Sequence, residues 1–250
     1  MIRAVFLGRR RYEPVHRLMQ ALNEARRRER GHDVILLVEH EPVITLGRSA
    51  HRDHVLLASD ALAARGVDLV ETGRGGDVTY HGPGQLVAYP ILRLERARRD
   101  VSRYVRNLAE VMILIAREHG VEAGTVDGLI GVWADAGAPT QWAGAAWADD
   151  IVKIGAIGVR LSRWVTMHGF ALNLATALDA FSMIVPCGIR EHGVSSLAAL
   201  TGQAPAVDAV ALASAPMFAR ALDAAVAPVE DLRHAPLDQL VPRPGEIDRM

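Results

Sequence analysis

The sequence is nearly free of two reactive residue types. Its 250 residues include one cysteine, Cys187, which excludes an internal disulfide and a cysteine-based metal cluster. They also include one lysine, Lys153, and every other basic residue is arginine or histidine. A desolvated lysine can lose its proton, whereas an arginine effectively cannot, so Lys153 is a candidate for proton transfer. An ordinary exposed lysine is the alternative.

Two broad features are missing as well. The chain has no long apolar run, so we expect no membrane span. Its net charge is −1, which gives no basis for nucleic-acid binding. The first residues, 1–7, predict a strand, and the arginines at 9–11 follow too soon for a secretory signal. With one cysteine and no export signal, we expect a cytoplasmic protein.

The spacing of apolar residues predicts both helices and strands. Helical spacing occurs over 14–29, 101–119 and 207–225. Short β-rich runs cover 34–39, 67–70, 86–92, 154–159 and 165–173. Helices separate these strands only occasionally, which favours a single α/β domain with a mixed β-sheet flanked by helices over a doubly wound fold. We expect that domain to span 1–227, with a proline-rich C-terminal tail over 228–250.

Cys187 stands between proline and glycine in the stretch Val-Pro-Cys-Gly-Ile at 185–189. Proline and glycine favour a turn, and turns commonly display reactive side chains. Because the thiolate is a strong nucleophile, Cys187 is a candidate catalytic residue. Unpaired cysteines are also often buried as small hydrophobic residues, which is the alternative interpretation.

Glycine and polar residues are densest over 72–85, where the sequence is TGRGGDVTYHGPGQ. Glycine permits close backbone approach to a ligand, and the polar side chains suit a binding loop. The spacing matches neither a P-loop nor a dinucleotide fingerprint. A tight hairpin between two strands is the alternative.

Two further segments carry candidate residues. Lys153 begins the glycine-containing run KIGAIG at 153–158, and His168 begins HGFALN at 168–173. Both runs predict strands. His168 fits either a buried core histidine or a residue that takes part in chemistry.

Together these segments resemble the octanoyltransferases of lipoate synthesis, also called lipoyl(octanoyl) transferases. The resemblance rests on RGGDVTYHGPGQ at 74–85, on the runs at 153–158 and 168–173, and on Pro-Cys-Gly at 186–188, and it extends over about 33–200. It implies the α/β fold of the biotin/lipoate protein ligase superfamily. The alanine- and glycine-rich stretch 134–150, which we interpret as an exposed hairpin loop or insertion, is longer than the family pattern.

The resemblance also implies a reaction and its participants. Cys187 would accept an octanoyl group from octanoyl-acyl carrier protein as a thioester, with Lys153 as its proton acceptor. The acyl group would then pass to a lysine of a lipoyl domain, in a 2-oxoacid dehydrogenase complex or the glycine cleavage H protein. No cofactor and no metal is implied. The motif positions expected to bind the substrate are Arg74, Gly75, Gly76, Asp77, Val78, Thr79, Tyr80, His81, Ala156, Ile157, Gly158, Gly169, Phe170 and Ala171.

Several alternatives remain at this point. His81 and His168 are rival bases, because an unperturbed histidine titrates near neutral pH. An ATP-dependent lipoate or biotin ligase on the same fold needs the lysine but no cysteine nucleophile. A carrier-binding module that only holds acyl chains, and an amidotransferase that moves octanoyl between lipoyl domains, are the other candidates.

Overall fold

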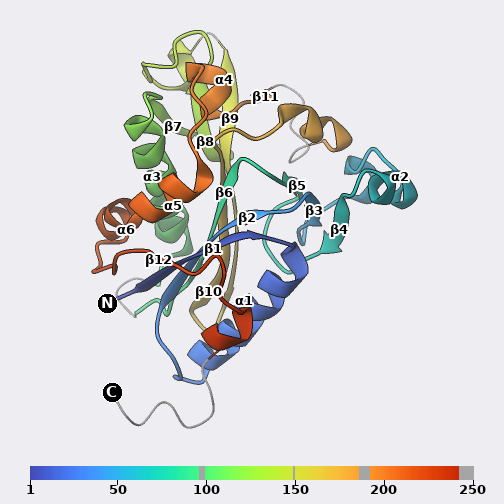
Figure 1. Cartoon of the computed structure of the whole chain (residues 1–250). Helices are drawn as coiled ribbons and strands as arrows, with labels where there is room; N and C mark the ends of the chain where they lie inside the picture. The colour runs from blue at the N-terminus through green and yellow to red at the C-terminus, as the bar shows by residue number, and fades with distance from the viewer. Residues whose placement is uncertain (96–98, 149, 186–191, 242–250) are drawn as a thin grey trace.

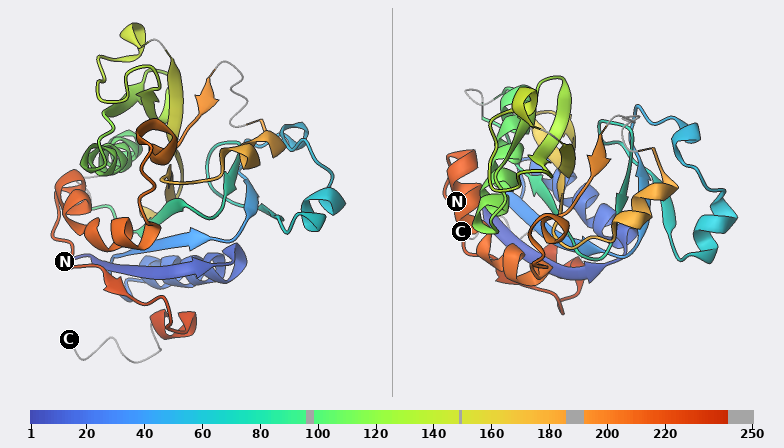
Figure 2. Two further views of the ribbon diagram at one scale, coloured as in Figure 1. Left: turned by 45° about the horizontal axis from the view of Figure 1, so that its top comes forward. Right: turned by 90° about the horizontal axis from the view of Figure 1, so that it is seen from above.

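A computed structural model describes residues 1–95, 99–148, 150–185 and 192–241. One large β-sheet forms the centre of the molecule, and helices cover both of its faces (Figures 1 and 2). Helix α1 (Tyr12–Arg27) packs on one face, and α3 (Val101–Glu118), α5 (Val207–Ala213) and α6 (Ala215–Leu222) pack on the other. Within the described ranges, no helix is long and apolar enough to cross a membrane.

The large sheet is mixed, as predicted. Strand pairs β12–β1, β1–β2 and β11–β9 are parallel, and the other neighbours are antiparallel. Strand β11 (Gly193–Val194) pairs with β9 outside the main order. The main order is β12 (Glu230–Asp231), β1 (Arg3–Arg10), β2 (Val34–His40), β6 (Gln85–Ile91), β10 (Val165–Asn173), β9 (Ile151–Ser162), β8 (Leu129–Asp135) and β7 (Ala123–Val126).

Strand β2 shows why both faces of this sheet need cover. Its side chains alternate between the two sides, as a period of two requires. Ile35 and Leu37 enter the core beneath α3, whereas Leu36 and Val38 enter the core beneath α1. All four side chains are fully buried. The middle of this strand is therefore apolar on both sides, and helices on both faces remove it from water.

Two of the three predicted helices are confirmed within two residues. These are α1 and α3, and Asp100 caps α3 by accepting a hydrogen bond from the Arg103 backbone N–H. The prediction of one continuous helix over 207–225 is wrong, because the chain breaks at Ser214 into α5 and α6. Pro216 explains the break: it lacks a backbone N–H and is tolerated only in the first turn of a helix.

A smaller sheet projects beside the large one, together with helix α2 (Ser59–Ala64) (Figure 1). Its strand order is β4 (Asp68–Glu71), β3 (Val43–Leu46) and β5 (Val78–His81). Part of the expected binding loop is therefore the strand β5. The turn at 82–84 is not a hairpin, because it carries the chain from β5 in the small sheet to β6 in the large one. Gly84 makes this turn with a φ of +80°, where glycine is favoured.

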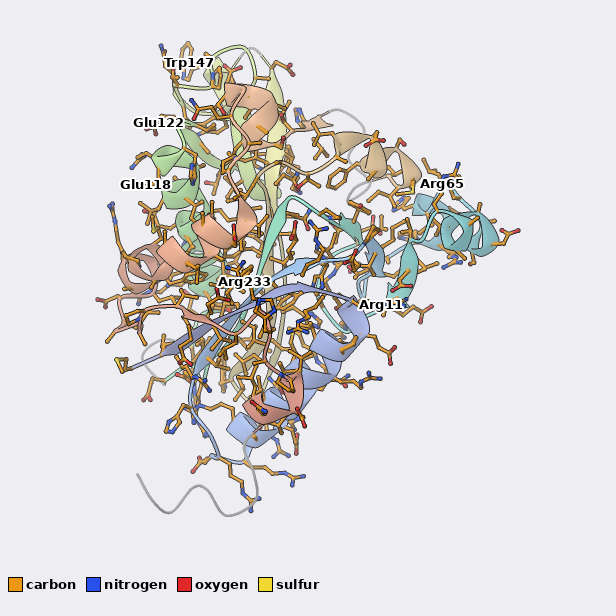
Figure 3. The ribbon with its side chains drawn as sticks, in the orientation of Figure 1. Arg11, Arg65, Glu118, Glu122, Trp147 and Arg233 are labelled. Carbon is orange, nitrogen blue, oxygen red and sulfur yellow. The ribbon has the colours of Figure 1, made fainter. Side chains whose placement is uncertain are left out.

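The remaining segments lie at the periphery. Residues 136–148 and 150 belong to the connection between the antiparallel strands β8 and β9, and Trp147 on this connection is 80% exposed (Figure 3). Helix α4 (Leu197–Thr201) follows β11. In the tail, β12 pairs with the edge strand β1, and a short 3₁₀ helix follows at Leu237–Leu240.

Candidate active site

One cavity gathers nearly all of the predicted binding residues. It lies between β5, β9, β10 and the start of α1. Every predicted binding position except Gly75 and Tyr80 lines it. The complete lining comprises Tyr12, Arg74, Gly76, Asp77, Val78, Thr79, His81, Val87, Tyr89, Ala156, Ile157, Gly158, His168, Gly169, Phe170 and Ala171.

The structure gives Gly75 and Tyr80 other positions. The Gly75 backbone N–H donates to the Val159 carbonyl at 2.8 Å and so attaches the glycine-rich segment to β9. Tyr80 points away from the cavity into the core of the small sheet, where its ring meets Phe181 edge-on at 5.6 Å. Side chains alternate along β5, so those of Val78 and Tyr80 enter that core while Thr79 and His81 face the cavity. Val78 belongs to that core and also lines the cavity.

Small residues form the wall where β9 and β10 meet. Ala156 pairs with Ala171, and Gly158 pairs with Gly169, across the antiparallel ladder. A Cβ atom on Gly158 would lie 3.0 Å from the Gly75 carbonyl oxygen, which is tighter than ordinary van der Waals contact. The glycine-rich segment therefore crosses the sheet at close range because Gly158 has no side chain.

Lys153 lines a smaller cavity that adjoins the first. The two cavities share Thr79, Ala156 and Ala171 as wall residues. Lys153 is 7% exposed, and its Nζ lies 5.0 Å from the centroid of the Trp133 ring, where an aromatic face attracts an ammonium group. The predicted catalytic lysine thus lies next to the end of the cavity that Ala156 and Ala171 form.

A buried hydrogen-bond network connects His81 with the strand of Lys153. Gln85 Nε2 donates to Asn173 Oδ1 at 2.9 Å, and Gln85 Oε1 lies 2.7 Å from His81 Nδ1. Asn173 Nδ2 donates to the Ser195 carbonyl, and the Ser195 N–H donates to the Lys153 carbonyl, both at 2.9 Å. Because Gln85 Oε1 can only accept, Nδ1 carries the proton of His81 and leaves its Nε2 as an acceptor.

His168 lies at the other end of the cavity in an unusual backbone conformation. It occupies strand β10 with a φ of +59°, a region that residues other than glycine rarely adopt. Its ring lies 5.7 Å from that of His16 and 6.3 Å from that of Tyr89. Its Nε2 is buried with no hydrogen-bond partner in the structure. This strain and this unpaired nitrogen both occur at the cavity wall.

Burial keeps the histidines of the cavity neutral. Burial first, and the neighbouring His40 second, lower the pKa of His81 to about 3. Burial, followed by His16 and Arg74, likewise lowers the pKa of His168 to about 3. Both imidazoles are therefore poor proton acceptors at neutral pH, which weakens them as rivals of Lys153.

Arg74 fixes the glycine-rich segment against the small sheet. Its Nη2 donates to the Thr45 carbonyl at 2.6 Å, and its Nη1 donates to the Gly75 carbonyl at 3.1 Å. The side chain is buried, with 8% of its residue surface exposed. Arg74 thus contributes both to the cavity wall and to the shape of the loop that forms it.

Three wall residues were missed in the sequence. Tyr12 begins α1, and Val87 and Tyr89 belong to β6. Tyr89 donates its hydroxyl hydrogen to His40 Nε2 at 2.9 Å, because His40 Nδ1 faces the Arg10 carbonyl. Tyr12 stacks parallel to His81 at 6.4 Å. No local motif marks these residues, since only the packing of α1 on the sheet brings them to the site.

The predicted nucleophile Cys187 lies outside the described residues. The chain is described up to Val185 and again from His192. The Val185 N–H donates to the His54 carbonyl at 2.8 Å. The His192 ring lies 5.6 Å from Trp133, the same ring that Lys153 contacts. The described residue that follows the cysteine segment is therefore close to the surroundings of Lys153.

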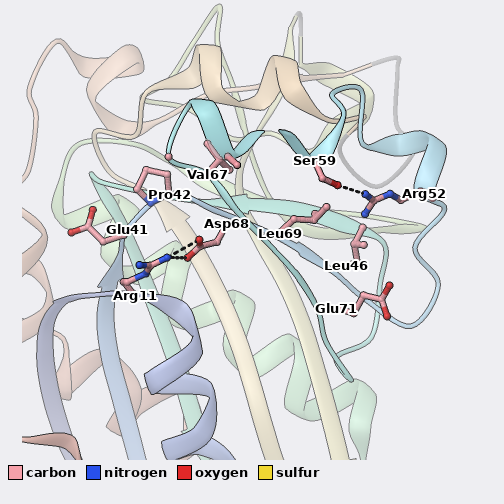
Figure 4. A pocket seen from close by; sticks show the side chains of 12 residues that line it. Arg11, Glu41, Pro42, Leu46, Arg52, Ser59, Val67, Asp68, Leu69 and Glu71 are labelled. Carbon is pink, nitrogen blue, oxygen red and sulfur yellow. Dashed lines mark hydrogen bonds and ion pairs between the residues drawn. The ribbon is translucent and has the colours of Figure 1, made fainter. Parts of the chain in front are cut away.

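A second hollow of about 740 Å³ lies beside β4 and α2 (Figure 4). Arg11 donates to Asp68 at 2.8 Å there, and Arg52 donates to Ser59 Oγ at 2.9 Å. None of the predicted site residues lines it. Charges of both signs cover its walls, which suits neither an acyl chain nor a single charged ligand.

Comparisons with known proteins identify the family of this chain. Residues 11–219 match the family described as the lipoyl protein ligase A/B catalytic domain. An octanoyltransferase of Myxococcus xanthus is 48% identical over 87% of this chain, which spans 58% of that protein's length. An octanoyltransferase of Solibacter usitatus is 43% identical over 92% of this chain and 96% of its own length.

A solved structure supports the fold. Lipoate-protein ligase A bound with ATP superposes with a TM-score of 0.66, covering 96% of this chain and 92% of the ligase. The two sequences are 18% identical, so this likeness concerns the fold alone. It confirms the lipoate ligase-like α/β fold that the resemblance implies.

Proposed function

The chain belongs to the lipoyl protein ligase A/B catalytic family, among its octanoyltransferases, and we propose how this enzyme carries its acyl group. Octanoyl-acyl carrier protein is the donor in this proposal. Cys187 attacks the donor thioester, forms an octanoyl thioester with the enzyme and releases the carrier thiol. A lysine amine of a lipoyl domain then attacks that thioester, gives the amide and releases Cys187.

The main support for this proposal is that the cavity extends along β10 away from the end that adjoins Lys153. From Ala171 to His168 the cavity wall extends over three residues of strand, about 10 Å at the usual rise. This length suits an extended octanoyl chain whose carbonyl lies at the Ala171 end. Burying about six methylenes there contributes on the order of 5 kcal/mol of binding free energy. Lys153 lines the adjoining cavity at the same end.

Lys153 is the proposed proton acceptor for both steps. A cysteine with a pKa near 8.5 is only about 3% thiolate at pH 7, so a nearby base or cation assists the first attack. The acceptor lysine must also lose a proton before it attacks. The neutral, buried state of His81 and His168 supports Lys153 for this role.

Intact mass spectrometry after incubation with octanoyl-acyl carrier protein tests the proposal. The wild type should gain one octanoyl group, Cys187→Ala should gain none, and Lys153→Ala should be acylated much more slowly. Lys153→Arg is the matched control, because it keeps a positive charge that cannot act as a base. Full-rate acylation of both lysine variants would exclude Lys153 as the base.

Intact mass spectrometry with a panel of donors separates the alternatives. An ATP-dependent ligase would modify a lipoyl domain from free octanoate and ATP without acylation of Cys187. A carrier-binding module would bind the donor without turnover. An amidotransferase would use an octanoylated lipoyl domain as donor in place of the carrier protein. Any of these results would replace the proposal.

A further inference from the structure

A histidine and a carboxylate form a pair beside the acyl cavity that the proposed chemistry does not use. His54 ends a short 3₁₀ helix at Arg52–His54, and its Nδ1 lies 2.5 Å from Asp77 Oδ2. The other carboxylate oxygen of Asp77 accepts the His51 backbone N–H at 3.3 Å. Both side chains are largely covered, with 26% and 12% of their surface exposed. Because the carboxylate only accepts, His54 Nδ1 carries the hydrogen.

Asp77 belongs to the cavity, whereas His54 does not line it. Asp77 stands in the glycine-rich segment immediately before β5 and is part of the cavity wall. Its carbonyl accepts the Gly47 N–H at 3.1 Å, which ties the segment to the end of β3. The Asp77 carboxylate is thus held by residues that follow β3, and His54 supplies the side-chain contact.

The backbone of His54 holds the segment that leads to the cysteine. The His54 carbonyl accepts the Val185 N–H at 2.8 Å, and the Leu56 N–H donates to the Met183 carbonyl at 2.9 Å. Between these bonds, Val55 forms an antiparallel bridge with Ile184. In the sequence, Cys187 follows Val185 by two residues.

We propose that His54 and Asp77 are positioning residues, which hold the segment before Cys187 in register with the wall of the acyl cavity. This inference rests on the proposed function for its catalytic consequence. A nucleophile must meet its thioester within a narrow geometry, and a misplacement of about 1 Å can lower the rate about a hundredfold. The His54 side chain attaches the segment 51–56 to Asp77 in the cavity wall. The backbone of the same segment is hydrogen-bonded to 183–185.

The covered position of the pair distinguishes it from a surface ion pair. Exposed pairs contribute little, because solvent screens them and the side chains lose entropy. Asp68 on β4 of the small sheet forms such a pair with Arg11, which is the N-cap residue of α1, and the two side chains are 36% and 69% exposed. That pair therefore supplies a matched control.

The test uses variants of the full chain and two measurements. One is the single-turnover rate of Cys187 acylation over a range of octanoyl-carrier concentrations. The other is alkylation by iodoacetamide, which reports on Cys187 alone because the chain has one cysteine. His54→Leu and Asp77→Ala remove the side-chain contact. His54→Asn restores a donor near the position of Nδ1, and Asp68→Ala is the control.

We expect His54→Leu and Asp77→Ala to lower the maximal acylation rate about tenfold, with the half-saturating donor concentration within about twofold. His54→Asn should keep the rate within about threefold, and both disruptive variants should change the alkylation rate at least about threefold. Wild-type rates in His54→Leu and Asp77→Ala would overturn the inference. A His54→Asn variant as slow as His54→Leu would also overturn it, because His54 would then act through Nε2.

The experiment distinguishes failure of the proposed function from failure of the inference about His54 and Asp77. A wild type that is never acylated refutes the proposed reaction, and the alkylation rates still decide whether the pair positions the cysteine. Unchanged alkylation in both disruptive variants would overturn the inference in that case. Melting temperatures of His54→Leu and Asp77→Ala that match that of Asp68→Ala would exclude general unfolding as the cause of any change in rate.

Discussion

Gly158 on β9 lies directly opposite Gly169 on β10, and both line the same cavity. Their missing side chains make room for different neighbours. A Cβ on Gly158 would approach the Gly75 carbonyl at 3.0 Å and Arg74 Cδ at 3.1 Å. A Cβ on Gly169 would collide with the Ala88 carbonyl of the adjacent strand. Gly158 therefore leaves room for the glycine-rich segment at the cavity wall, and Gly169 leaves room for the backbone of the neighbouring strand β6.

Alanine substitution should separate these two effects. We expect Gly158→Ala to displace the loop slightly, with about a tenfold loss of octanoyl transfer and less than about 1 kcal/mol of destabilisation. Gly169→Ala should lower the free energy of unfolding by about 2–3 kcal/mol, because strand backbone yields less readily than a loop. Urea denaturation and transfer kinetics measure the two quantities. Equal destabilisation of both variants would contradict this explanation.

Gly131 on β8 is expected to control the position of Lys153. A Cβ there would lie 2.5 Å from Lys153 Cε and 3.3 Å from its Nζ. Gly131 also has a φ of +141°. Gly131→Ala should therefore move the lysine and lower the acylation rate at least about tenfold. Gly128→Asn is the control, because Gly128 has nothing within 4 Å and asparagine tolerates its φ of +79°. A normal rate in Gly131→Ala would show that the amine tolerates displacement.

Gln85 should be essential to the network beneath the cavity. Replacing it by leucine leaves His81 Nδ1 and Asn173 Oδ1 without the partner they now share. A buried polar group left unpaired costs about 1–3 kcal/mol. We expect Gln85→Leu to lose about 2–4 kcal/mol of stability and much of its transfer activity. Gln85→Glu keeps an acceptor for His81 and loses the donor to Asn173, so chemical denaturation of both variants separates the two contacts.

The buried histidines predict a fall in stability at mildly acidic pH. Burial lowers the pKa of His40 to about 4 and those of His81 and His168 to about 3. A histidine in the unfolded chain titrates near 6.5, so below this pH the unfolded chain binds protons that the native protein does not. The free energy of unfolding is therefore unaffected by these histidines above about pH 6.5, and it decreases as the pH falls from 6.5 toward 4.

Thermal unfolding between pH 7.5 and pH 5 measures this effect. Each buried histidine should contribute a loss on the order of 1–2 kcal/mol by pH 5, where carboxylates still remain mostly ionised. His40→Gln should show a shallower fall than the wild type. His32 is exposed, so His32→Gln should keep the full dependence. A pH-independent melting temperature would contradict the neutral, buried state of these rings.

The sequence predicts the central strands β2, β6, β9 and β10, because burial on both faces makes them rich in apolar residues. Strand β10 agrees with the predicted 165–173 at both ends. The predicted helix over 207–225 failed at Ser214, where local periodicity continues but Pro216 prevents a continuous helix. Helical spacing shows which residues lie on the apolar face of a helix. It does not reveal a break when the apolar residues on either side of the break keep the same spacing.

The candidate site was predictable where its residues are contiguous. Glycine and polar residues at 74–81 stand together in the chain and meet one cavity, apart from Gly75 and Tyr80. Alternation along β5 explains why Tyr80 points elsewhere, and that strand was expected to be a loop. Tyr12 could not be identified, because its place at the cavity follows from the packing of α1 on the sheet.

The covered position of the chain's single lysine has a consequence for the fate of the acyl group. Lys153 is buried, and the sequence holds no other ε-amine. An activated octanoyl thioester acylates any neutral amine that reaches it. Apart from the histidines, every other basic side chain of this protein is an arginine, whose guanidinium stays protonated and is a poor nucleophile. One copy of the enzyme therefore offers another no accessible lysine side chain to modify.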